Sequence, residues 1–309
     1  MSFWTDNTIV ITGASGFLGR YLISRLQKIG ATKVYAPTWD LRDRDNAEKM
    51  YEHFSPDVII HLAARAGGIQ KNMQQPANMF YDNMKMGMEI IDAGKRSGAK
   101  IVMMGSACEY PKLASTPIKE SSLWEGYPEE TNGAYGIAKR ALEAMGQAYR
   151  QQYGMNIIHL LSANLYGPGD NFGDGSHFIP AVIRQCVEAR NARKDSLTLW
   201  GTGKATRDFL YVEDAAEGIL LAAEHYEEAA PVNLGSGREL SIYEVAEKIN
   251  ILTGFNGELL WDGRMPDGQP RRVLATNLAK EKFGFEAQTL FECGLRETID
   301  WYNAKLRPN

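Results

Sequence analysis

The chain has 309 residues, 44% of them hydrophobic, and a formal net charge of −4 at pH 7. This length and apolar content are enough for a sizeable core, which excludes a disordered chain. Lysines and arginines are scattered among the acids, so no broad basic face is expected and nucleic acid is excluded as a partner.

Targeting and cysteine signals point to one compartment. The N-terminal residues show no basic stretch followed by an apolar run, and no apolar segment is long enough to cross a membrane. The cysteines Cys108, Cys186 and Cys293 form no C-x-x-C pair, so neither a disulfide framework nor a metal site is expected. We therefore expect a soluble cytoplasmic protein without a structural metal.

Short apolar runs typical of buried strands alternate with helical patterns in the first half of the chain. The alternation predicts an α/β fold: a doubly wound parallel sheet of the Rossmann type, with ligands bound beyond the carboxyl ends of its strands. The expected strands lie at 8–13, 33–37, 57–64, 100–107 and 157–163, and the expected helices at 17–30, 46–54, 79–98 and 135–154.

After about residue 166 the alternation weakens, and glycine, proline and isolated charges become frequent. Such a region suits loops that close over a ligand. Residues 232–237, VNLGSG, predict one more strand that returns to the parallel sheet. We expect a first domain of residues 1–165 with a returning segment at about 206–236. A smaller, discontinuous C-terminal domain of residues 166–205 and 237–309 would bind the substrate.

The stretch GASGFLG places Gly13, Gly16 and Gly19 in a G-x-x-G-x-x-G spacing between a strand and a helix. Glycines there let the backbone approach a pyrophosphate, which the free N–H groups at the helix start stabilise. The motif alone also fits an ordinary tight turn, but its strand–helix context favours a dinucleotide. The residues expected to line this cofactor are Gly13, Ser15, Gly16, Phe17, Leu18, Asp40, Leu41, Leu62, Ala63, Ala64, Tyr135, Lys139, Asn164 and Leu165.

The end of the second strand decides between NAD and NADP, because a carboxylate there accepts from a free 2′-hydroxyl and an arginine holds a 2′-phosphate. This chain has Ala36, Pro37 and Thr38 instead, so the choice stays open. Asp40 follows. It is equally suited to accept a hydrogen bond from the adenine amino group or to cap a helix that begins at Arg42.

Tyr135 and Lys139 lie four residues apart in YGIAK, and therefore on one face of a helix. An ammonium close to a phenol lowers the phenol pKa, so that the tyrosine can exchange a proton with a carbonyl oxygen. A Y-x-x-x-K pair alone is commonly a solvated surface pair. Together with Ser106 at the end of a strand and with the glycine turn, it becomes a specific signal for hydride chemistry.

With these residues the chain resembles the extended short-chain dehydrogenases/reductases, and more narrowly the GDP-L-fucose synthase family. That family carries out 3,5-epimerisation and 4-reduction of GDP-4-keto-6-deoxymannose. The blocks that carry the resemblance run through nearly the whole chain in order: HLAARAGGI (61–69), GSACEYPK (105–112), NLYGPGDNF (164–172), SHFIPAVIR (176–184), WGTGKATRDFLYVED (200–214) and MPDGQPRR (265–272).

The resemblance implies roles for particular residues. Cys108 and His177 match the base and acid that epimerise carbons beside a ketone, whereas the bland alternatives are a packed thiol and a surface imidazole. Ser106, Tyr135 and Lys139 would serve the reduction. The residues implied for the nucleotide sugar are Arg184, Trp200, Arg207 and Asp267. NADPH and a homodimer are implied in the same way.

Four departures from the family pattern leave alternatives open. Arg65 stands in place of a lysine, Met265 in place of another, and Glu109 in place of an apolar residue beside Cys108, where a carboxylate would raise the thiol pKa or pair with His177. No arginine follows the second strand. A net reductase using NADP or NAD therefore competes with a redox-neutral epimerase that keeps NAD bound.

Overall fold

The computed structural model describes residues 3–306 and contains one large parallel sheet. Its strand order is β10-β5-β4-β3-β1-β2, with every neighbouring pair parallel. The central strands are buried along their whole length, as expected for a parallel sheet covered on both faces. The strands are β1 (Ile9–Thr12), β2 (Val34–Tyr35), β3 (Val58–His61), β4 (Lys100–Ser106), β5 (Ile157–Ser162) and β10 (Val232–Leu234).

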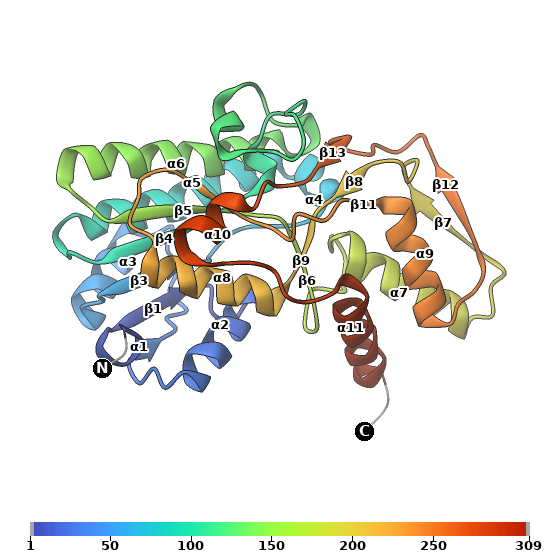
Figure 1. Ribbon diagram of the computed structural model, residues 1–309, viewed down its shortest axis with the longest axis horizontal. Helices are drawn as coiled ribbons and strands as arrows, with labels where there is room; N and C mark the ends of the chain where they lie inside the picture. The colour runs from blue at the N-terminus through green and yellow to red at the C-terminus, as the bar shows by residue number, and fades with distance from the viewer. Residues whose placement is uncertain (1–2, 307–309) are drawn as a thin grey trace.

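Helices cover both faces of this sheet (Figure 1). Alternate residues of a strand point to opposite faces. Ile9 and Ile11 accordingly share a core with Leu22 of α2, whereas Val10 shares another with Met50 of α3. The first core includes α2 (Phe17–Lys28) and α8 (Val212–His225), and the second includes α3 (Arg44–Phe54), α5 (Pro76–Ala93) and α6 (Gly133–Tyr153). The predicted doubly wound Rossmann-type sheet is confirmed.

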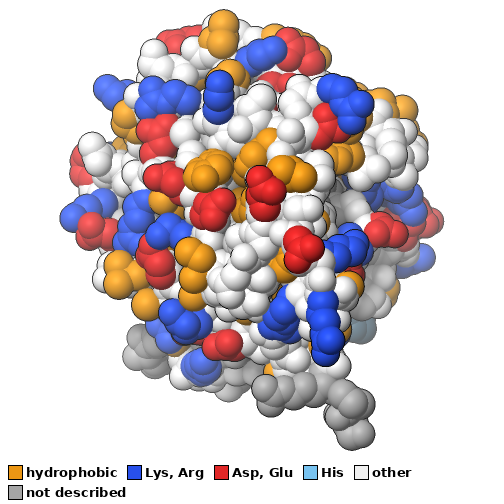
Figure 2. All heavy atoms as spheres, turned by 90° about the vertical axis from the view of Figure 1, so that its right-hand side faces the viewer, with side chains coloured by type: hydrophobic (Ala, Val, Ile, Leu, Met, Phe, Trp, Pro, Cys, Tyr) orange, Lys and Arg blue, Asp and Glu red, His pale blue; other side chains and the backbone are white. Residues whose placement is uncertain are grey.

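A second group of elements with its own core stands to the right of the sheet in Figure 1. Parallel strands β7 (Ser196–Trp200) and β12 (Glu258–Asp262) lie there, with α7 (Phe178–Asn191) and α9 (Ile242–Thr253) packed together. Figure 2 shows that positive and negative side chains are interspersed on the face that this side presents. The remaining elements are α1 (Phe3–Asp6), α4 (Ile69–Gln74), β6 (Asn164–Tyr166), β8 (Thr206–Arg207), β9 (Phe209–Tyr211), β11 (Leu240–Ser241), β13 (Arg271–Arg272), α10 (Asn277–Phe283) and α11 (Phe291–Lys305), with 3-10 turns η1 (Gly94–Arg96), η2 (Ala107–Glu109), η3 (Glu120–Trp124) and η4 (Glu130–Asn132).

The predicted strands and helices of the first half are all present, and residues 232–234 join the sheet beside β5 as expected. The second half is more regular than its composition suggested, because α7, α8, α9 and α11 each span at least 12 residues. Glycines and prolines fall between these helices and mask their periodicity in the sequence. Within residues 3–306 no helix is both long and apolar enough to cross a bilayer.

Asp208 joins the two groups of elements. It lies between β8 and β9 and is 1% exposed. Its carboxylate accepts hydrogen bonds from the Ser236 amide (2.9 Å), the Ser236 hydroxyl (2.6 Å) and the Gly237 amide (3.1 Å), all in the loop after β10. Its own amide donates to the Arg272 carbonyl of β13 at 2.9 Å. One buried carboxylate thus fixes the loop beyond the last sheet strand against the chain that leads to β9.

Replacing this carboxylate tests how much the joint stabilises the fold. Asp208→Ala leaves several buried donors without an acceptor, and we expect the free energy of unfolding to fall by about 3 kcal/mol. Urea denaturation followed by circular dichroism measures this change. Asp300→Ala, at an exposed position of α11, is the control and should change stability by less than ~0.5 kcal/mol. Equal stabilities of the two variants would contradict a structural role for Asp208.

Candidate functional site

The glycine turn between β1 and α2 has the geometry that a dinucleotide requires. Gly13 has a φ of +69°, and a Cβ there would lie 2.7 Å from the Ala63 amide nitrogen. A Cβ on Gly19 would lie 2.5 Å from the Ala14 Cα, so the helix and the turn approach too closely for any side chain. Gly16 caps α2 without a side-chain hydrogen bond, which leaves the first N–H groups of the helix facing outward. These features fit a pyrophosphate.

Two of the predicted cofactor residues from another strand lie against this turn. Leu62 and Ala63 follow β3 and lie directly against Gly13. Thr12 contacts His61 through a 2.8 Å hydrogen bond between its hydroxyl and Nδ1. Burial lowers the His61 pKa to about 3, so this histidine stays neutral and is a core residue, as expected. Ser15 and Ala64 are exposed, Phe17, Leu18, Asn164 and Leu165 are partly buried, and Leu41 is buried.

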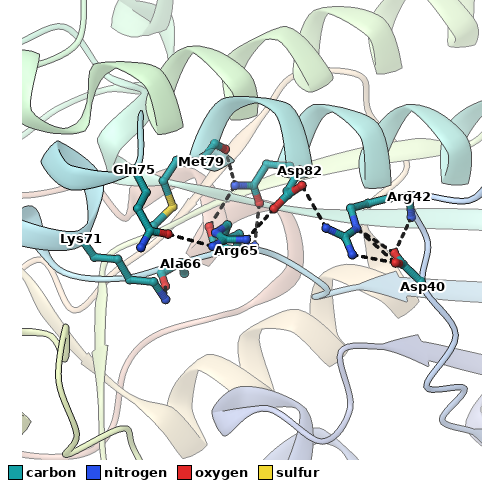
Figure 3. A network of polar contacts seen from close by, with 9 residues as sticks. Asp40, Arg42, Arg65, Ala66, Lys71, Gln75, Met79 and Asp82 are labelled. Atoms are coloured by element: carbon teal, nitrogen blue, oxygen red, sulfur yellow. Dashed lines mark hydrogen bonds and ion pairs between the residues drawn. The ribbon is translucent and has the colours of Figure 1, made fainter. Parts of the chain in front are cut away.

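An ion-pair network occupies the edge where the adenosine is expected (Figure 3). Arg42 donates to both oxygens of Asp40, at 2.9 Å and 2.7 Å, and lies 3.3 Å from Asp82. Arg65 contacts the other oxygen of Asp82 at 2.8 Å, and also Gln75 at 2.8 Å. The hydrogen bonds from Arg42 lower the Asp40 pKa to about 2. Both arginines are therefore already paired with carboxylates.

The structure bears on the two alternatives for Asp40, a hydrogen bond to adenine and a helix cap. The helix begins at Arg44, and its N-cap is Asp43, whose side chain accepts from the Asp45 amide. The expectation that a helix begins at Arg42 with Asp40 as its cap is wrong, because the helix begins two residues later. Asp40 instead accepts the Arg42 amide at 3.0 Å as well as the Arg42 guanidinium. Its side chain is 52% exposed, so it is still accessible to an adenine amino group.

Ser106, Tyr135 and Lys139 meet at the carboxyl end of β4. Ser106 ends the strand and Tyr135 and Lys139 come from the first turns of α6. Lys139 is 3% exposed, and its ammonium donates to the Met104 carbonyl at 2.8 Å. The Ser106 hydroxyl accepts the Cys108 amide at 3.2 Å, which makes Ser106 the N-cap of η2. The structure thus brings together the three residues that the sequence predicted.

The charge state of this trio differs from the expectation. Burial raises the Tyr135 pKa, with smaller contributions in the same direction from Cys108 and Glu109, while Ser106 and Arg272 lower it. Burial lowers the Lys139 pKa to about 8. The net shift is upward, so the lowering expected from Lys139 does not determine the phenol pKa in the free protein. Tyr135 is held as a protonated phenol, which is the form that donates a proton.

Arg272 connects the thiol and the imidazole that the sequence singled out. Its Nη1 lies 3.1 Å from the Cys108 Sγ and its Nη2 lies 3.0 Å from the Asn164 side-chain oxygen. His177 is the N-cap of α7, and its pKa is lowered by burial and by the charges of Arg272 and Lys71. Arg272 thus contacts Cys108 directly and acts on His177 through its charge. A role for Arg272 was not predicted from the sequence, although RR within MPDGQPRR was available as a signal.

Glu109 pairs with a histidine other than the expected His177. Its side chain is fully buried, and its Oε2 lies 3.1 Å from Nε2 of His159 in β5. The other oxygen accepts the Ser106 amide at 2.7 Å. No partner for His159 could be recognised from the sequence, because Glu109 lies 50 positions away in the chain.

The residues expected to bind the nucleotide sugar differ in burial and in their hydrogen-bond partners. Arg207 is 7% exposed and donates to the carbonyls of Gln269 and Asp267, and burial and the charge of Arg272 lower its pKa to about 9. Asp267 accepts the Thr202 amide and hydroxyl, each at 2.7 Å, and Trp200 is 46% exposed on β7. Arg184 stands apart on α7 and lies 3.5 Å from Asp174.

Arg264 is the cation adjacent to Met265, which stands in place of a family lysine. Arg264, beside Met265, forms a bidentate pair with Asp262 at 2.8 Å and does not replace the missing lysine as a free cation. Among residues 3–306, no cluster of three or more His, Cys, Asp or Glu side chains is suited to a metal ion.

Comparisons with known proteins agree with this arrangement. Residues 9–235 match the NAD dependent epimerase/dehydratase family. The chain belongs to this family. A GDP-L-fucose synthase from Sinorhizobium fredii is 37% identical over 305 residues, which cover 97% of each chain. This relative confirms the resemblance that the sequence blocks predicted.

Solved structures of this family share the whole fold. A GDP-L-fucose synthetase from Naegleria fowleri bound to NADP aligns with a TM-score of 0.88 at 29% identity, covering 99% of this chain and 95% of that one. A GDP-6-OMe-4-keto-L-xylo-heptose reductase from C. jejuni aligns with a TM-score of 0.92 at 26% identity, covering 99% of both chains. As a member of the epimerase/dehydratase family, the protein is an NAD(P)-dependent enzyme.

The Arg42 network makes a prediction about the 2′-phosphate. Arg42 is neutralised by Asp40, so a 2′-phosphate at this edge gains little from it and faces a carboxylate. Asp40→Asn removes that carboxylate, and we expect the ratio of the NADP dissociation constant to the NAD dissociation constant to fall about 5-fold. Calorimetric titration with both cofactors measures the ratio. Asp43→Asn, which removes a nearby carboxylate that binds the Asp45 amide, is the matched control. An unchanged ratio in Asp40→Asn would contradict the prediction.

Proposed function

We propose that the protein is a nucleotide-sugar epimerase/reductase that converts a GDP-4-keto-6-deoxyhexose to GDP-L-fucose or a related sugar. It would epimerise beside the ketone and then reduce carbon 4. The observation that carries this proposal is Arg272, whose guanidinium contacts the Cys108 thiol and whose charge acts on His177, next to the Ser106–Tyr135–Lys139 group. Epimerising and reducing groups thus share one site.

The epimerisation would use Cys108 and His177. A proton on a carbon next to a ketone is acidic, and inverting that centre needs removal from one face and return to the other. The Arg272 guanidinium lies 3.1 Å from the Cys108 sulfur, the atom that would accept the proton. His177, whose pKa is lowered, is in its protonated form a stronger acid than an exposed imidazolium and returns a proton readily.

The reduction would use the second group of residues. The nicotinamide, when bound, supplies the hydride to carbon 4. Tyr135, held protonated by burial, donates its phenolic proton to the carbon 4 oxygen, and the Ser106 hydroxyl hydrogen-bonds that oxygen. The Lys139 ammonium stabilises the phenolate left behind. Its own pKa of about 8 keeps it charged in neutral solution.

The nucleotide part would lie against the second group of elements. Arg207 is a buried cation whose donors reach backbone carbonyls, not a carboxylate, so its charge is available to a diphosphate. Trp200 offers an exposed ring for the base or ribose. We assign cofactor binding to residues 1–165 with 206–236, and substrate binding to residues 166–205 and 237–309.

We further propose that the enzyme works in the cytoplasm as a homodimer, as the resemblance implies. On one side of α5, Phe80, Tyr81 and Met88 are 40%, 62% and 37% exposed. A second copy packed on this helix would remove that apolar surface from water. The redox-neutral epimerase is the less favoured alternative, because the structural relatives include a reductase of a GDP-4-keto sugar.

Absorbance of reduced nicotinamide tests the proposed reaction. Adding GDP-4-keto-6-deoxymannose to the protein with NADPH or NADH should consume the cofactor stoichiometrically. Tyr135→Phe lacks the proton donor, and we expect its rate to fall at least ~100-fold while cofactor binding, measured by calorimetry, is unchanged. No consumption by the wild type with either cofactor would refute the proposed reduction and direct attention to the redox-neutral alternative.

The Arg272–Cys108 contact gives a second prediction. In an Arg272→Met variant the Cys108 sulfur loses its cationic hydrogen-bond donor, and we expect alkylation of Cys108 by iodoacetamide at pH 7 to slow by roughly 10-fold. Arg272→Lys should retain part of the reactivity. The measurement uses a Cys293→Ala background, because Cys293 is exposed. Solvent deuterium exchange at the carbons beside the ketone should fall in parallel, and Cys108→Ala should abolish it. Equal alkylation rates with and without the Arg272→Met substitution would contradict the assignment.

A further inference from the structure

A buried pair of ionisable side chains lies directly behind the proposed catalytic turn, and the reaction described above does not use it. Glu109 is 0% exposed and His159 is 4% exposed. Glu109 comes from the 3-10 turn η2 after β4, and His159 from the middle of β5. Burying a carboxylate costs free energy unless it is paired and hydrogen-bonded. An apolar side chain at position 109 would avoid that cost, so the pair calls for a physical explanation.

The backbone between the two side chains is shaped to hold them. A Cβ on Gly105 would lie 2.4 Å from the Glu109 Oε1 and 2.4 Å from the His159 Nε2. The space beside β4 is therefore filled by the pair, and position 105 must be glycine. His159 lies 3.3 Å and 3.1 Å from the two carboxylate oxygens through Nε2. Its Nδ1 has no hydrogen-bond partner among the described residues.

The unpaired Nδ1 means that His159 is held in the site through Nε2 alone, by the two oxygens of Glu109. The Glu109 carboxylate also binds the Ser106 amide, so its polar partners lie on β5 and at the end of β4.

The ammonium of Lys139 binds the same strand end. The Lys139 ammonium binds the Met104 carbonyl and the Glu109 carboxylate binds the Ser106 amide, so the two opposite charges hold β4 on either side of Gly105. Burial lowers the Lys139 pKa, and Glu109 is the group that raises it. The Coulomb attraction between an ammonium and a carboxylate is strong where water is excluded.

We propose that Glu109, oriented by His159, is a positioning residue of this enzyme: it is the buried counter-charge of the Lys139 ammonium and fixes the backbone of Ser106. The carboxylate acts on the reduction through these two residues and touches neither substrate nor cofactor. The proposal deepens the proposed function, since it concerns the same site, but its first test does not depend on the substrate.

Other charged groups face this part of the site and must be held constant in any test. Burial and the charge of Lys139 lower the pKa of His61 in β3, which is neutral. Besides burial, Cys108 of η2 raises the Tyr135 pKa, and Arg272 of β13 lowers it. Burial lowers the pKa of Arg140 in α6, and the charge of Glu109 opposes that shift. Arg140 donates to the Glu109 carbonyl at 2.8 Å, so it secures the turn through its backbone. None of these residues is changed in the variants below.

Glu109→Gln is the first variant, because it keeps the shape and a carbonyl oxygen for the Ser106 amide but removes the charge. Protein labelled with ¹³C at lysine Cε allows the Lys139 signal to be titrated, and its assignment follows from its loss in Lys139→Arg. We expect the Lys139 midpoint to fall by about 1 pH unit in Glu109→Gln.

Glu120→Gln is the matched control. Glu120 is also a partly buried carboxylate that accepts a backbone amide, that of Asn233 at 3.0 Å, but it is not among the charges that act on Lys139. Its substitution should leave the Lys139 midpoint unchanged. An unchanged midpoint in Glu109→Gln would overturn the proposal whether or not the enzyme reduces a keto sugar.

A double variant separates the counter-charge from simple packing. In Glu109→Leu with His159→Leu the pair is replaced by apolar side chains, which commonly leaves stability near that of the parent. We expect this folded variant to show the lowered Lys139 midpoint, and a purely structural pair predicts no shift. If keto-sugar reduction is observed, its rate in Glu109→Gln should fall at alkaline pH about 1 pH unit earlier than in the wild type, because Lys139 loses its proton earlier. Coincident profiles would count against the proposal, while absence of reduction in every protein would refute only the proposed function.

Discussion

The backbone groups of the last residues of β4 form hydrogen bonds with charged side chains, and the rest of the site depends on these hydrogen bonds. The Met104 carbonyl receives the Lys139 ammonium, the Ser106 amide binds the Glu109 carboxylate, and Gly105 between them has no room for a side chain. Parallel strands leave unpaired backbone groups at their carboxyl ends, and here buried charges bind them. The geometry of Ser106 and of the following turn to Cys108 is set by this strand end.

Burial governs the electrostatics of the whole site. It raises the Tyr135 pKa and lowers those of Lys139, His177 and Arg207, in each case toward the neutral form. Desolvation disfavours charge wherever water is excluded, and a group remains charged only where a partner offsets that cost. The charge states of these buried groups therefore depend on which oppositely charged groups lie beside them. A diphosphate beside Arg207 would supply an anion that the free protein lacks there.

Much of this arrangement could be predicted from the sequence, for identifiable reasons. Strands of four to seven apolar residues and the glycine spacing are local signals, so the parallel sheet and the turn after β1 were expected correctly. The pair Tyr135 and Lys139 lies on one helix, and its relation to Ser106 followed from the resemblance. Roles that depend on contacts between distant segments were less accessible. The Arg42 network, the Glu109–His159 pair and the burial that controls the Tyr135 pKa appear only when the chain is folded.

The origin of Arg272 has a consequence for how the enzyme is made. Its guanidinium contacts the Cys108 sulfur although the two residues are 164 positions apart in the chain. Arg272 lies in β13, which pairs with β8. During synthesis, the first domain can emerge from the ribosome and begin to fold long before residue 272 exists. A nascent chain of this kind holds Cys108 without the Arg272 guanidinium beside its sulfur. Translation order therefore completes the surroundings of Cys108 only when nearly the entire polypeptide is present.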